Sequence, residues 1–103
     1  MNAIAETNDR LRKNIPLIWP PHRLVLTRRV ASMPEDLLKR VFEAVRAFDN
    51  FNRDNDPYHE HDCGIVDVDG DRFIWKFNYY DDDFEFFREN GNRVLTIMHA
   101  SEY

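Results

Sequence analysis

The residues best suited to chemistry gather in one stretch, Asn55 to Gly64, which reads Asn-Asp-Pro-Tyr-His-Glu-His-Asp-Cys-Gly. In an extended segment alternate side chains point the same way, so His59, His61 and Cys63 have a spacing that suits three ligands of one metal ion. No second pair of soft ligands accompanies them in the sequence. We therefore expect no metal ion and no other cofactor, and keep these three residues as an alternative metal site.

The same stretch supports an enzymatic alternative, a small metal-dependent nuclease or hydrolase centred on the Asp56–Asp62 loop. Carboxylates and a lysine can hold Mg²⁺ and stabilise a developing phosphate charge, and a histidine beside a carboxylate can act as a general base. The spacing is unfavourable, because the residue two before the candidate lysine is Ile74 rather than an acid, and no nucleophile is evident. The candidate catalytic residues of this alternative are Asp56, Glu60, His61, Asp62 and Lys76.

The interpretation that we favour for this loop is structural. Asn55 and Asp56 precede a proline, a combination that favours turns capped by the side chains themselves. We expect Phe51 and Tyr58 to pin the loop to the core. The connection from residue 49 to residue 62 is nevertheless long for a small domain, and long loops are disproportionately functional, so both interpretations stay open.

Charge divides the chain into two halves. The first 48 residues hold nine Lys/Arg and five Asp/Glu, whereas residues 49–103 hold five and fourteen, within a net charge of −5. An acidic surface favours a basic partner and disfavours nucleic acid, whose phosphates need cations. Acidic and aromatic side chains are interleaved before the C-terminal strand, with Phe86 and Phe87 close by. The predicted binding residues are Tyr79, Tyr80, Asp81, Asp82, Asp83, Phe84 and Glu85.

Length and composition indicate one ordered domain over residues 1–103, with an N-terminal helix and a proline-rich connector in residues 1–22 and the core in residues 23–103. The 14% aromatic content supplies apolar bulk for that core. A single cysteine excludes an internal disulfide, and no apolar run approaches the roughly 20 residues of a membrane span. We expect a cytoplasmic protein without membrane contact, and keep a homodimer as an alternative assembly.

The most regular helical pattern covers residues 33–48. Ser32 can cap the first turn, and Glu35, three residues later, can reach back to complete a capping box. The apolar side chains of this segment lie on one face at helical spacing. That stripe consists of Leu38, Val41, Phe42, Val45 and Phe48. A weaker pattern, with Ile4, Leu11 and Ile15 on one face, predicts a short helix over residues 2–14.

Residues 64–80 have the alternation of a β-hairpin around Asp69-Gly70, a pair that suits a two-residue type I′ turn. This turn fixes the register and places Asp67 opposite Arg72. The face expected against the long helix carries Phe73, Trp75, Phe77 and Tyr79. Two further strands are predicted over residues 23–30 and 93–100, and the second is apolar on both faces and therefore central.

Residues 81–91 favour a short helical turn, because they begin with acids and end with a glycine. The connector at residues 16–21 is expected to pack Trp19 onto the core. The predicted order of elements is α-β-α-β-β-(α)-β. We therefore predict an α+β fold, in which a mostly antiparallel four-stranded sheet packs with one long helix and one or two short helices.

Several motifs resemble a small, mainly proteobacterial family that is catalogued as a domain of unknown function. They are Asn55-Asp56-Pro57-Tyr58, Glu60-His61-Asp62, Gly64, Trp75-Lys76, Tyr79-Tyr80-Asp81 and the closing run from Arg93 to Tyr103. The resemblance covers the chain from about residue 23 onward and implies a shared fold without an activity. The chain departs from the family pattern at His59, usually glycine, and at Cys63, usually phenylalanine, which weakens the alternative metal site.

Genes of that family often lie in plasmid or phage settings, which implies an accessory role. Together with the acidic second half, this leads us to predict an accessory protein that acts by binding another protein, one with a basic groove. Its specific form would be a mobile-element-encoded inhibitor of a nucleic-acid-handling host defence complex, similar to anti-CRISPR proteins.

Overall fold

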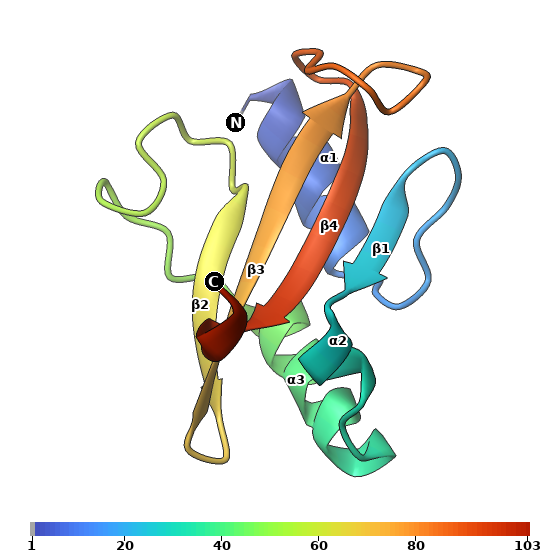
Figure 1. Cartoon of the computed structure of the whole chain (residues 1–103). Coiled ribbons are helices and arrows are strands. Elements are labelled where there is room, and N and C mark those ends of the chain that lie inside the picture. Colours follow the sequence, from blue (N-terminus) through green and yellow to red (C-terminus); the bar gives the residue numbers. More distant parts are fainter. Residues whose placement is uncertain (1) are drawn as a thin grey trace.

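A computed structural model describes residues 2–103 and shows a four-stranded sheet with its long helices on one face (Figure 1). The predicted α+β class is therefore confirmed. The elements in chain order are α1 (Ala3–Arg12), β1 (Arg23–Leu26), α2 (Arg28–Ala31), α3 (Glu35–Ala47), β2 (Cys63–Val68), β3 (Asp71–Tyr80), β4 (Asn92–His99) and a final 3-10 turn, η1 (Ala100–Glu102). Within residues 2–103, no helix is both long enough and apolar enough to cross a bilayer.

The sheet has the strand order β1-β4-β3-β2, so β4 is central, as its apolar sequence predicts. The pairs β2–β3 and β3–β4 are antiparallel, but β1 runs parallel to β4 with Arg23 opposite Val94 and Leu26 opposite Ile97. The sheet is thus mixed but mostly antiparallel, as predicted, and β1–β4 is its one parallel pair. The pairing joins segments about 70 residues apart, and no local pattern in the sequence specifies its direction.

The β2–β3 hairpin has the predicted register, including Asp67 opposite Arg72, whose side chains lie 3.0 Å apart. Asp69 and Gly70 both have positive φ, at 53° and 81°, as a type I′ turn requires. The face toward the helices carries Phe73, Trp75 and Phe77, which are almost fully buried. Their packing confirms which side of the hairpin faces the core.

Helix α3 confirms the predicted apolar stripe, since Val41 and Val45 are fully buried and the rest of the stripe packs around them. The predicted capping box is wrong. Ser32 Oγ instead donates to the carbonyl of Arg28 at 2.6 Å, and Pro34 occupies the N-cap position without a side-chain cap. The hydroxyl therefore bonds to a carbonyl of the preceding helix α2, and α3 begins only at Glu35.

Strand β1 ends at Leu26, so the predicted continuation to Val30 is wrong. Glu102, from the other end of the chain, explains the change. Its carboxylate accepts from the Thr27 hydroxyl at 2.7 Å and from the backbone N–H of Arg29 at 3.0 Å, which supports the first turn of α2. A contact over more than 70 residues thereby turns the chain away from the sheet.

The N-terminal segment buries Leu11 and Ile15 of its predicted apolar face, but it buries polar side chains as well. Leu11 is fully buried, but so are the polar residues Asn8 and Arg12. The connector also differs in part, since Trp19 remains 37% exposed with Arg10 5.6 Å above its ring. The N-terminal helix therefore contributes polar anchors as well as apolar surface to the structure.

Residues 81–91 form no helix, which corrects the predicted helical turn. Asp81 Oδ1 accepts from the backbone N–H groups of Asp83 and Glu85, and Phe84 has a positive φ of 56°. That left-handed residue interrupts the run of helical dihedral angles that a helical turn needs. The segment is an ordered loop that joins β3 to β4 at one end of the sheet (Figure 1).

Candidate functional site

Two polar loops carry the residues that the sequence singles out. We call residues 49–62, which connect α3 to β2, the central loop, and residues 81–91, which connect β3 to β4, the acidic loop. Figure 1 shows the central loop in green beside β2 and the acidic loop in orange and red where β3 ends and β4 begins. They are therefore separate regions of the molecule, and each can be assessed by what its side chains contact.

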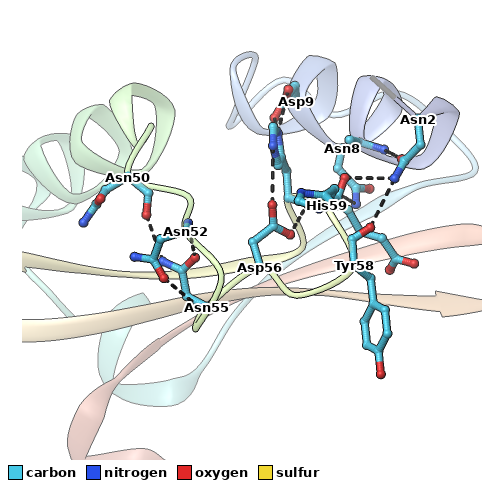
Figure 2. Close-up of polar contacts among 12 residues, drawn as sticks. Asn2, Asn8, Asp9, Asn50, Asn52, Asn55, Asp56, Tyr58 and His59 are labelled. Carbon is cyan, nitrogen blue, oxygen red and sulfur yellow. Dashed lines mark hydrogen bonds and ion pairs between the residues drawn. The ribbon is translucent and has the colours of Figure 1, made fainter.

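The first half of the central loop is built from side-chain-capped turns, as predicted. Asn52 Oδ1 accepts from the backbone N–H groups of Asp54 and Asn55, at 2.9 and 3.1 Å. Asn55 Oδ1 in turn accepts from the backbone N–H of Asn52, and Asn55 Nδ2 donates to the carbonyl of Asn50 (Figure 2). These bonds satisfy polar groups locally and hold the loop in one conformation.

Asp56 lies at the base of the central loop and is 3% exposed. Its Oδ1 accepts from the backbone N–H of His61 at 3.0 Å, and its Oδ2 lies 3.5 Å from His61 Nε2. The two residues that bracket this turn, His59 and His61, have positive φ values of 58° and 54°. Non-glycine residues rarely adopt this conformation, so the buried carboxylate stabilises a strained turn.

His61 is enclosed by contacts from helix α1 and from the central loop itself. Its Nδ1 lies 3.0 Å from both carboxylate oxygens of Asp9 on α1, and its ring stacks on Phe51 at a centroid distance of 3.9 Å. With Asp56 at Nε2, both ring nitrogens face carboxylates that belong to the protein. A general base needs a ring nitrogen within reach of substrate, and here Nδ1 is bound by Asp9 and Nε2 faces the Asp56 carboxylate at 3.5 Å.

The alternative metal site does not assemble in the described chain. Because His59 and His61 have positive φ, they break the extended alternation that would align them with Cys63. The Cys63 sulfur instead lies 3.6 Å from the carbonyl of Asn55. Across residues 2–103 no group of three His, Cys, Asp or Glu side chains lies close enough to hold a metal ion.

Four of the five residues of the hydrolase alternative are divided between two clefts. Asp56 and His61 line one of about 640 Å³, whereas Asp62 and Lys76 line another of about 540 Å³ beside β2. Burial raises the pKa of the Asp62 carboxyl, and the charge of Asp56 adds to the rise. Glu60 lies in neither cleft, and burial together with the charge of Asp62 raises its pKa.

Helix α1 ties the central loop to the rest of the fold. Asn8 donates to the carbonyl of Glu60 at 3.0 Å and to the Tyr79 hydroxyl at 2.8 Å, and it accepts from Arg93 Nε at 3.0 Å. Arg93 also donates to Asn90 Oδ1 at 2.6 Å. Burial raises the pKa of Tyr79 and lowers that of Arg93, because each charged form would lose hydration.

Arg12, one turn further along α1, is 1% exposed. Its guanidinium donates to the carbonyls of Val45 and Arg46 at 2.8 and 2.9 Å, and it pairs with Asp9 at 3.2 Å. Arg12 thus caps the last turn of α3, where carbonyl groups lack helical partners. The same Asp9 that holds His61 also orients this arginine, so α1, α3 and the central loop form one connected brace.

The sequence did not indicate the roles of Asn8 and Asp9, which contact the central loop across 52 residues, or of Arg12, which bonds to the end of α3. The only available signal was polar residues in the weak N-terminal helix at helical spacing. The prediction that Tyr58 anchors the central loop is wrong. Tyr58 is 78% exposed and its ring points away from the helices in Figure 2.

The acidic loop exposes a larger share of its side chains to solvent than the central loop does. Asp81 is turned inward, and the backbone N–H of Glu85 bonding to its carboxylate lowers its pKa. Phe84 lies under the guanidinium of Arg23, 3.7 Å from the ring centroid. Tyr79 and Tyr80 are half-buried, so among the predicted binding residues the exposed ones are Asp82, Asp83 and Glu85.

Beside these exposed acids, the acidic loop carries two large apolar side chains. Phe86 is 70% exposed and Phe87 is 73% exposed. The backbone beneath them is ordered by hydrogen bonds from Asp81 N–H to Phe86 carbonyl at 2.8 Å and from Gly91 N–H to Arg88 carbonyl at 2.9 Å. Gly91 allows this close approach, since a Cβ there would lie 2.8 Å from the Arg88 carbonyl oxygen.

Comparison with known proteins adds a family but no activity. A family model described as "Protein of unknown function (DUF3768)" matches residues 26–102, which is more than half of the chain. The match includes both loops but not α1. No curated protein and no solved structure matches the chain.

Proposed function

Because the chain belongs to the family of proteins of unknown function DUF3768, membership supplies no activity, and we propose a function from the surface of the molecule itself. The protein acts by binding another protein through the acidic loop. Phe86 and Phe87 enter the contact as apolar anchors, and the surrounding carboxylates face a basic groove on the partner.

The observation that carries this proposal is the exposure of two adjacent phenylalanines on an ordered loop. Phe86 and Phe87 are 70% and 73% exposed, although the backbone that holds them is hydrogen-bonded. Exposed apolar patches rimmed by polar residues mark interaction sites, and large aromatic side chains dominate the energetics of many interfaces. An ordered loop also reduces the entropy cost of binding.

Charge supports a basic partner. The carboxylates of Asp82, Asp83, Glu85 and Glu89 are exposed around the two phenylalanines, and one nearby cation, Arg88, is paired with Asp82 at 3.2 Å. Like charges gathered on one loop accelerate encounter with an oppositely charged groove and reject acidic surfaces. Asp81 belongs to the scaffold of the loop rather than to the contact, because its carboxylate accepts backbone bonds.

The specific form that we propose is an accessory inhibitor that works in the cytoplasm. It occupies the basic groove of a nucleic-acid-handling host defence complex, as anti-CRISPR proteins do. Carboxylates can replace phosphate charges, and phenylalanine rings can take the place of bases in stacking positions. The hydrolase alternative has less support, because both nitrogens of His61 face carboxylates and its other candidate residues do not converge.

Photo-crosslinking in the host cell tests the proposal. A photoreactive phenylalanine analogue replaces Phe87 in one protein and Tyr58 in a control, which is also an exposed aromatic residue but lies on the central loop. We expect a discrete crosslinked partner from position 87 and none from position 58. Equal crosslinking from both positions, or none from position 87, would contradict the proposal.

A further inference from the structure

Strand β2 forms a free edge of the sheet within residues 2–103. The backbone N–H of Phe77 donates to the carbonyl of Asp62 at 2.7 Å, which fixes the phase of the antiparallel ladder. By the alternation of such a ladder, the N–H and C=O groups of Cys63, Ile65 and Asp67 point away from β3. In the described chain none of these backbone groups has a hydrogen-bond partner.

The outer face of the sheet, away from the helices, carries a row that ends at this edge. Ile65 pairs with Ile74, and Ile74 pairs with Met98, so three apolar side chains cross three strands in line. Ile65, at the edge, is 53% exposed. The opposite edge strand, β1, has four residues, so β2 is the longer strand available for pairing.

We propose that β2 pairs antiparallel with β2 of a second copy of this chain, about a two-fold axis that passes beside Ile65. In this register Ile65 lies opposite Ile65 of the second copy, and Cys63 lies opposite Asp67. All the outward backbone groups of the strand then form hydrogen bonds. The apolar row continues across the axis, and a two-fold interface makes each contact away from the axis twice.

The charges on the outer face fit this register. Lys76 pairs with Cys63 in the sheet, is exposed, and makes no ion pair within residues 2–103. In the dimer, Asp67 of the second copy lies two strand spacings away, about 10 Å between backbones, across the small Cys63 side chain. Extended side chains bridge that distance. A register that instead placed Asp67 opposite itself would oppose two like charges.

The structure leaves room for the second strand. Cys63, Gly64 and Ile65 line a cleft of about 540 Å³, whose other lining residues include Asn50 and Asn55 of the central loop. The central loop therefore borders this part of the edge but leaves a cleft beside it. On the helix side, Gly64 would lie opposite Val66 of the second copy and has no side chain to obstruct it.

Sedimentation velocity over a range of protein concentrations tests the proposal, with the Ile65→Lys variant beside the wild type. We expect the wild type to shift from monomer to dimer as concentration rises, and the variant to remain monomeric because two lysines would face each other. Val25→Lys is the matched control, since Val25 is an exposed apolar residue of the other edge strand, and should dimerise like the wild type. A wild type that stays monomeric, or an Ile65→Lys variant that still dimerises, would overturn the proposal.

A disulfide test checks the register. In the Asp67→Cys variant the new thiol would lie opposite native Cys63 of the second copy, at a Cα separation of about 5.5 Å that a disulfide can span. Mild oxidation should give a covalent dimer, and Val25→Cys should give no more covalent dimer than the wild type. Failure of the Asp67→Cys variant to crosslink would overturn this register. Neither test depends on the acidic loop.

Discussion

The central loop and the acidic loop use the same kinds of residue for different purposes. Both connect regular elements with acids, amides and aromatic rings. In the central loop Asp56 is buried and His61 is enclosed by Asp9, Asp56 and Phe51, so the polar groups satisfy one another. In the acidic loop Asp81 and Asn90 are used this way, whereas Phe86 and Phe87 face solvent. The difference shows that exposure, rather than residue type, separates a candidate binding surface from a structural brace.

The largest effect is expected from removing Arg12, which joins α1 to the end of α3. Arg12→Met should lower the free energy of unfolding by about 3 kcal/mol, because it leaves the carbonyls of Val45 and Arg46 and the carboxylate of Asp9 without their donor. Urea unfolding measures the loss. Lys13→Met, an exposed neighbour on the same helix end, is the control. A loss no larger than that of the control would contradict the conclusion that Arg12 joins α1 to the end of α3.

A smaller loss is expected from Asp56→Ala, by about 2 kcal/mol, since the strained turn at His61 loses its buried acceptor. Asp54→Ala removes an exposed acid of the same loop and should change the free energy of unfolding by less than about 0.5 kcal/mol. Chemical denaturation of both variants provides the comparison. If Asp56→Ala were as stable as Asp54→Ala, the central loop would be free for another role.

Titration of one carboxyl from each loop tests the difference between the two loops. Starting from the same ordinary pKa of 3.8, the pKa of Asp62 is raised by burial, whereas that of Asp81 is lowered by the bond from Glu85 N–H. Asp81 therefore contributes stability that is present above its unfolded pKa and lost as pH falls through its lower folded pKa. Asp62 acts oppositely, since stability declines as pH rises from the unfolded to the folded pKa. Carboxyl ¹³C NMR measures both, and shifts of the same sign would contradict this account.

The smallest effect on stability should come from the residues proposed to bind. The double variant Phe86→Ser/Phe87→Ser should change the free energy of unfolding by less than about 0.5 kcal/mol, because exposed side chains contribute little to the core. Thermal unfolding beside the wild type measures it. A loss near that of Asp56→Ala would mean that the phenylalanines support the fold and are not reserved for a partner.

The parts of the fold that could be predicted are those determined by neighbours in sequence. Asp69-Gly70 specifies a two-residue turn, and the turn fixes the hairpin register from Val68 to Cys63. The spacing of Val41 and Val45 likewise specifies the buried face of α3. In both cases the determining interactions lie within a few residues.

The parts that could not be predicted depend on distant partners. The parallel direction of β1 and the end of this strand at Leu26 follow from β4 and from Glu102. The environment of His61 follows from Asp9, which lies 52 residues away. The residue types of the central loop suggested several functions, and the contacts of Asp9 and Asp56 reveal that His61 is already paired.

Capture of a partner from lysate of the host cell tests the central claim most directly. Three baits are compared: the wild type, a variant with Asp82, Asp83 and Glu85 changed to lysine, and a matched reversal with Glu43, Asp49 and Asp54 changed to lysine. The residues of the matched reversal are exposed acids outside the acidic loop. We expect mass spectrometry to find a protein that is captured by the wild type and by the matched reversal and is lost with the acidic-loop reversal. Equal capture by all three baits, or capture by none, would contradict it.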